Sequence, residues 1–154
     1  MRKLASACAN GRLSTVVEKA VIQRLLVQLD EYLRDLDEVR LGYSLADYKG
    51  NKVIRRYTER TLQVAIEACL DLASHVISRQ GYREPLDNKD CFQVLLENNL
   101  LPLELARSLK RMAQFRNVVV HDYIRVDPEI VYTIVQQNIP DIATFARIVE
   151  EMAL

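Results

Sequence analysis

The chain has 154 residues, 49% of them hydrophobic, and its 21 lysines and arginines balance 21 aspartates and glutamates. Glycine and proline number four each, about half their usual share, which argues against a many-stranded sandwich or barrel and favours long helices. With no tryptophan, 6% aromatic residues and zero net charge, the composition argues against a protein that coats nucleic acid through bulk charge or stacks several bases.

Membrane insertion and export are not expected. The apolar runs fall far short of the roughly 18 residues that span a bilayer, and the N-terminus lacks the apolar stretch of a signal peptide. Cys8, Cys69 and Cys91 are odd in number, widely spaced and without a CxxC pair. This usage fits buried or incidental thiols in a reducing compartment, not a disulfide framework or a zinc site. We therefore predict a cytoplasmic protein with no membrane partner, no metal and no cofactor.

The chain begins with a polar, small-residue stretch. Residues 1–13 are predicted to form a flexible lead-in, and residues 14–154 a single helical domain. Thr15 followed by Glu18 resembles a capping box at the start of a long helix. Apolar residues then recur at helical spacing as far as Gly42, where this helix is expected to end.

Further helices follow a short segment at 44–50. Their expected ranges are from about Asn51 to Arg79, Asn88 to Glu97, Pro102 to about His121, and Asp127-Pro128 to the end of the chain. Pro140 interrupts the last of these, but the apolar register survives on both sides, which predicts one kinked helix instead of two. The predicted fold is all-α: an up-down four-helix bundle with an additional short helix and a kinked C-terminal helix.

The helix expected at 102–121 departs from a regular amphipathic pattern. Each residue turns about 100°, so the core stripe contains Leu105, Leu109, Met112, Ala113 and Val120. Arg116 projects about 20° from the centre of that stripe, where an arginine is costly unless it is ion-paired or held at a cleft. A salt-bridged or snorkelling structural arginine is the alternative.

The same helix is apolar nearly all round from Met112 to Val120, because Phe115 and Val118 lie on the side that is charged one turn earlier. A helix that is apolar on every side is covered on every side, which predicts contact with a second subunit. His121 ends this helix, and Asn117 lies on its face four residues earlier, able to orient the imidazole. His75 is interpreted as an ordinary polar residue.

These residues read Arg116-Asn117-Val118-Val119-Val120-His121-Asp122-Tyr123, or R-N-x3-H-x-Y. The pattern resembles the signature of HEPN-domain ribonucleases, specifically the HepT-like toxins. The segments RTLQVAIEACLDLASHVI and FRNVVVHDYIRVDPEIVY extend the resemblance, which covers about residues 15–150. It implies a homodimer in which Arg116 and His121 cleave RNA without metal. It also implies a minimal nucleotidyltransferase antitoxin that transfers AMP to Tyr123.

The chemistry agrees with this resemblance. RNA supplies its own nucleophile in the 2′-OH, so a histidine that moves protons and an arginine that stabilises the phosphate are sufficient. Two alternatives stay open: an inactive HEPN-like module that partners a nucleotidyltransferase, and a purely structural helical dimer. Arg55, Arg56 and Arg60 are interpreted as a solvated helix face, with RNA contact as the alternative.

Overall fold

The computed structural model describes the backbone of residues 2–121 and 126–152 and the side chains from residue 16 onward within those ranges. This part of the chain is built from helices, which confirms the all-α class. They are α1 (Arg2–Gly42), α2 (Leu45–Gly50), α3 (Lys52–Gln80), α4 (Asn88–Glu97), α5 (Leu103–His121), α6 (Pro128–Gln137) and α7 (Ile139–Glu151). In the described ranges, no helix is both long and apolar enough to cross a membrane.

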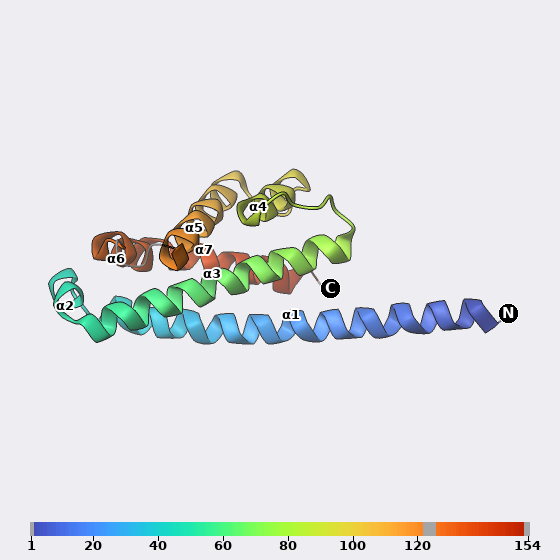
Figure 1. Cartoon of the computed structure of the whole chain (residues 1–154), viewed down its shortest axis with the longest axis horizontal. Helices are drawn as coiled ribbons and strands as arrows, with labels where there is room; N and C mark the ends of the chain where they lie inside the picture. Colours follow the sequence, from blue (N-terminus) through green and yellow to red (C-terminus); the bar gives the residue numbers. More distant parts are fainter. Residues whose placement is uncertain (1, 122–125, 153–154) are drawn as a thin grey trace.

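The two long helices α1 and α3 lie side by side along the long axis and run in opposite directions (Figure 1). Helix α7 packs against both of them, and α4 and α5 pack against α3. The short helix α2 contacts α6 at the end of the pair where the chain passes from α1 to α3. The long pair thus serves as the base on which α5, the helix that carries the motif, is placed.

One core joins these helices. Its fully buried side chains include Leu29 and Leu36 of α1, Leu62 and Leu72 of α3, Phe92 of α4, Leu109 of α5, Val135 of α6 and Phe145 of α7. The rings of Phe92 and Phe145 meet edge to face, with centroids 5.7 Å apart. Each such side chain contributes about 1.5–3 kcal/mol on burial, so the predicted apolar stripes account for the association of the helices.

Local chemistry fixes several helix ends where the sequence predicts them. The side chain of Asn51 accepts a hydrogen bond from the backbone N–H of Ile54 at 3.1 Å and caps α3. Gly81 ends α3 in the left-handed conformation, with φ of 69°. Asp127 caps α6 by accepting from the N–H of Glu129 at 2.9 Å, with a proline in the first turn.

The N-terminal segment differs from its prediction. The backbone of residues 2–13 is helical and forms the first turns of α1, which extend beyond the other helices in Figure 1. Thr15 therefore lies inside a helix, so the predicted capping box at Thr15 and Glu18 is wrong. Alanines and long polar residues in this segment favour helix, and no glycine or proline stops it between Leu13 and Leu41. That residues 1–13 lie outside the domain stays a prediction.

The segment at 44–50 is also more ordered than the sequence analysis indicated. Ser44 accepts from the N–H of Asp47, the carboxylate of Asp47 accepts from the N–H of Ser44, and this capping box begins α2. The pattern S-x-x-D is a recognised helix-start signal, so the sequence contained the information.

The C-terminal helix is divided in two, which corrects the prediction of a single kinked helix. Helix α6 ends at Gln137 and α7 begins at Ile139, with Asn138 between them. Pro140 has no N–H to donate to the carbonyl of Gln136, and its ring disfavours the continuous helix. The break is fixed by Asp141, whose carboxylate accepts from Ser108 of α5 at 2.6 Å and from Asn138 at 3.2 Å.

Candidate active site

The motif residues occupy the last turns of α5. The structure describes Arg116, Asn117 and His121, whereas Tyr123 falls within 122–125 and lies outside the described residues. The projection of Arg116 onto the inner side of α5 is confirmed, because its side chain is only 24% exposed and reaches α3.

Arg116 is ion-paired with Glu67 of α3. Its Nε and Nη2 lie 3.1 and 3.0 Å from the same carboxylate oxygen, Oε1 of Glu67, whose side chain is 32% exposed. Gln63, one helical turn earlier on α3, donates to that oxygen at 3.0 Å. Glu67 thus neutralises the partly buried charge of Arg116, and Gln63 holds the carboxylate of Glu67 in place. A partly buried arginine requires such an ion pair.

The ion pair leaves part of the guanidinium available. Nη1 of Arg116 donates to Oδ1 of Asn117 at 3.3 Å, so the contacts with Glu67 and Asn117 engage each guanidinium nitrogen once. A guanidinium has five N–H donors, two on each terminal nitrogen. Within the described chain, one donor on Nη1 and one on Nη2 stay open. These two donors can bind a phosphate, for which the fork of an arginine is well suited.

His121 lies exposed at the C-terminal end of α5. It is five residues from Arg116, a rotation of about 140°, and no hydrogen bond joins the two residues in the part of the chain that the structure describes. Asn117 was predicted to orient His121; the hydrogen bond it makes among the described residues goes to Arg116. One chain therefore presents the arginine and the histidine on different sides of α5.

The C-terminal half of α5 carries exposed apolar side chains. Val118 and Val120 are 50% and 38% exposed, whereas Val119 is buried, so the prediction that Val120 belongs to the core stripe is wrong. The apolar stripe projected from the sequence is therefore not covered as far as the end of α5 within the described chain.

Glu67 is the site residue that the sequence analysis missed. It lies 49 residues before Arg116, and its helical position relative to Gln63 indicates only that the two share one face of α3. The pairing with Arg116 depends on how α3 packs against α5. No local spacing encodes that packing, although a cation predicted on an apolar face does require some buried or half-buried anion.

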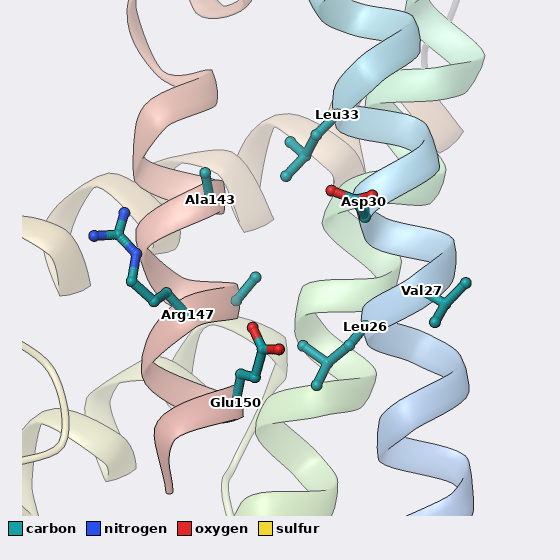
Figure 2. A pocket seen from close by; sticks show the side chains of 8 residues that line it. Leu26, Val27, Asp30, Leu33, Ala143, Arg147 and Glu150 are labelled. Carbon is teal, nitrogen blue, oxygen red and sulfur yellow. The ribbon is translucent and has the colours of Figure 1, made fainter.

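Other features of the described chain do not add to this site. Cys69 and Cys91 are buried free thiols, as predicted, and burial raises the pKa of both; Cys8 lies outside the described side chains. Among the described residues, no three His, Cys, Asp or Glu side chains gather in a way that could hold a metal ion. A groove between α1 and α7, with Leu26 and Leu33 pointing into it in Figure 2, has no lining residue on α5.

Comparison with known proteins gives the site its context. The family model described as "Ribonuclease HepT-like" matches residues 29–149. The mRNA nuclease HepT of Shewanella oneidensis is 30% identical over 131 residues, covering 85% of this chain and 92% of that protein. The tRNA nuclease HepT of Aphanizomenon flos-aquae is 30% identical over 118 residues, covering 77% of this chain and 80% of that protein.

Solved structures agree with the family match. A tri-AMPylated HEPN toxin of Shewanella oneidensis, in complex with its MNT antitoxin, superposes with a TM-score of 0.78 at 27% identity, covering 85% of this chain and 97% of that one. A toxin–antitoxin structure with AMP-PNP gives 0.80 at 26% identity, covering 86% and 98%. The match extends over most of the described fold, including the helix that carries Arg116. The chain therefore belongs to the ribonuclease HepT-like family.

Proposed function

We propose that this chain is the toxin of a toxin–antitoxin pair and an endoribonuclease that cleaves RNA without a metal ion, through Arg116 and His121. The observation that carries the proposal is the state of Arg116. It is half-buried, held by Glu67 and Asn117, and has donors left on both terminal nitrogens. Arg116 also lies within residues 29–149, which match the family model described as "Ribonuclease HepT-like".

The proposed reaction uses the ribose 2′-OH as nucleophile. Its oxygen attacks the adjacent phosphorus, the bond from phosphorus to the 5′-oxygen breaks, and the products are a 2′,3′-cyclic phosphate and a 5′-hydroxyl. His121 accepts the proton of the 2′-OH or donates one to the leaving 5′-oxygen, because imidazole titrates near neutrality. Arg116 binds the phosphate oxygens, on which negative charge increases in the transition state.

We further propose that two copies of the chain form the site. Arg116 and His121 are on different sides of α5, and the exposed Val118 and Val120 lie between them in sequence. A two-fold dimer through this end of α5 would cover the valines and bring the arginine and histidine of both copies to one cleft. Two histidines at one cleft would also supply the separate base and acid that the reaction requires.

The proposed partner is a minimal nucleotidyltransferase that transfers AMP to Tyr123, with both proteins acting in the cytoplasm. A relative of this chain, the HEPN toxin of Shewanella oneidensis, is solved in a tri-AMPylated form in complex with an MNT antitoxin. Tyr123 is two residues beyond His121. AMP there adds a phosphodiester charge and a bulky nucleoside next to the cleft, where the charge competes with RNA phosphate for Arg116.

The test is cleavage of RNA in EDTA by purified wild-type protein and by Arg116→Ala and His121→Ala. The matched controls are Arg107→Ala, an exposed arginine of the same helix, and His75→Ala, the other histidine of the chain. We expect cleavage by wild type and both controls and none by the two motif variants, all with the same circular dichroism. Cleavage that survives in either motif variant contradicts the assignment, and a wild type that binds its antitoxin without cleaving RNA indicates the inactive module.

A further inference from the structure

A positively charged hollow lies beside the motif. It has a volume of about 770 Å³ and is formed where α2, the first turns of α3 and the start of α6 meet. Its lining consists of Lys49, Lys52, Arg55, Arg56, Glu59, Val126 and Pro128. Four cations and one carboxylate line it, and although Lys49 is ion-paired with Glu129, the hollow keeps an excess of positive charge in a chain whose net charge is zero.

The hollow is close to the motif along the chain. His121 ends α5 and Val126 lines the hollow, so five peptide units join them. A chain of that length reaches at most about 18 Å. The two places are therefore close enough for one short single strand of RNA to pass both His121 and the hollow.

The wall of the hollow is held by contacts between α2 and α6. Lys49 is ion-paired with Glu129, and the ring of Tyr48 packs against that of Tyr132 with centroids 5.6 Å apart. The hydroxyl of Tyr132 donates to the carbonyl of Tyr43 at 2.9 Å. These contacts fix α2, and with it Lys49, against α6, whereas the other three cations of the hollow are carried by α3.

The cations differ in how much they are already engaged. Arg55 donates to the carbonyl of Lys49, and both Arg55 and Arg56 act on Glu59, opposing the rise in the pKa of its carboxyl that burial causes. Lys52 and Arg56 are exposed, and neither forms an ion pair with another described residue. These two are the cations most available to an anionic ligand.

We infer that this hollow binds the phosphate backbone of single-stranded RNA and extends the proposed nuclease site on the side next to His121. The inference rests on the proposed function, since it assigns the hollow to the same substrate. Excess positive charge, an open shape and the apolar lining residues Val126 and Pro128 suit a sugar–phosphate chain. The helix face that carries Arg56 then contacts RNA, which is the alternative that the sequence analysis gave beside a solvated face.

The test is the salt dependence of RNA binding by the full-length chain, with His121→Ala as background so that RNA is not cleaved. The probe is a short fluorescent single-stranded RNA of mixed sequence, followed by anisotropy. Each phosphate contact on a single strand contributes about 0.7 to the slope of log K against log salt. We expect Lys52→Ala/Arg56→Ala, which removes two such contacts, to reduce the magnitude of this negative slope by about 1.4. Between about 50 and 200 mM salt, binding by the His121→Ala parent then weakens roughly sevenfold more than binding by the variant that also carries the two substitutions.

The matched control is Arg24→Ala/Lys89→Ala, which removes two exposed cations from α1 and α4. The control is expected to keep the parental slope. An unchanged slope in the hollow variant, or an equal loss in the control, overturns the inference. Loss of antitoxin binding with an unchanged RNA slope overturns it as well and assigns the hollow to a protein partner. Failure of the proposed function is separate, because it appears as absence of cleavage by wild type.

Discussion

The ion pair between Arg116 and Glu67 leads to a quantitative prediction. We expect a double-mutant cycle of Arg116→Ala and Glu67→Ala to give a coupling free energy of about 1–2 kcal/mol. Fully exposed pairs contribute about 0.2–1 kcal/mol, and breaking a buried pair costs about 3–5 kcal/mol. With side chains 24% and 32% exposed, this pair lies between those cases. The cycle cancels the separate losses of the arginine stem and of the Gln63 hydrogen bond.

The measurement is urea denaturation followed by circular dichroism. With a urea slope of roughly 2 kcal/mol per molar, this coupling corresponds to a midpoint difference of about 0.5–1 M. The control cycle is Arg107 with Glu104, an exposed pair on the same helix with side chains 57% and 82% exposed. We expect that pair to couple by no more than about 0.5 kcal/mol. The reasoning is refuted if the Arg116 cycle is additive within about 0.3–0.5 kcal/mol or if both cycles give the same coupling.

The same pair makes a prediction for catalysis. Glu67 holds two guanidinium nitrogens of Arg116, so Glu67→Ala lets the proposed phosphate ligand move. We expect kcat to fall by about tenfold, equivalent to about 1.4 kcal/mol, with the pH profile unchanged because Glu67 moves no proton. Glu67→Gln retains an acceptor oxygen and restores part of the rate. Full activity in Glu67→Ala would show that Arg116 needs no such support.

Three further predictions follow from other parts of the molecule. When co-expressed with the nucleotidyltransferase, Tyr123→Phe should show no increase in intact mass, whereas wild type should gain the mass of one or more AMP groups. AMP on the variant would show that another residue is modified. Val118→Asp should keep the helical circular dichroism of wild type, because the side chain is 50% exposed. Light scattering should show that the molar mass of the variant in solution is half that of wild type, and an unchanged molar mass excludes this dimer surface. The hydrogen bond from Arg83 lowers the pKa of Asp90 to about 2 from 3.8, so its stabilising contribution is present above about pH 4 and is lost as the pH falls towards 2. Asp90→Asn should therefore have a lower melting temperature than wild type at pH 6, and nearly the same melting temperature as wild type near pH 2. If the variant and wild type melt at the same temperature at pH 6 as well, the prediction is contradicted.

The fold was largely predictable because its signals are local. Apolar stripes identified the long helices, and Asn51, Gly81 and Asp127 marked their ends through backbone hydrogen bonds that short-range chemistry determines. The break at Asn138 was not predicted, because the apolar register survives on both sides of Pro140 even though the backbone does not continue. The spacing of apolar residues indicates which side of a helix is buried, but it does not indicate whether the backbone hydrogen bonds of the helix are continuous.

The site was predictable only in part. The helical projection placed Arg116 on the inner side of α5, where the structure finds it. The partner Glu67 and the exposure of Val120 depend on which helices meet along α5 and how far each reaches. Those are properties of the packed molecule. The two-subunit cleft stays a prediction that the arrangement of one chain motivates.

If the chain cleaves RNA by itself through the 2′-OH of the substrate, removing that hydroxyl must stop the reaction. The most direct measurement compares, in EDTA, an RNA oligonucleotide with the same oligonucleotide that carries one 2′-deoxyribose at the cleaved position, with products identified by mass spectrometry. We expect the first to yield a 2′,3′-cyclic phosphate and a 5′-hydroxyl, and the second to stay intact at that position. Cleavage at the deoxyribose, or cleavage that appears only when a divalent metal is added, would contradict this expectation.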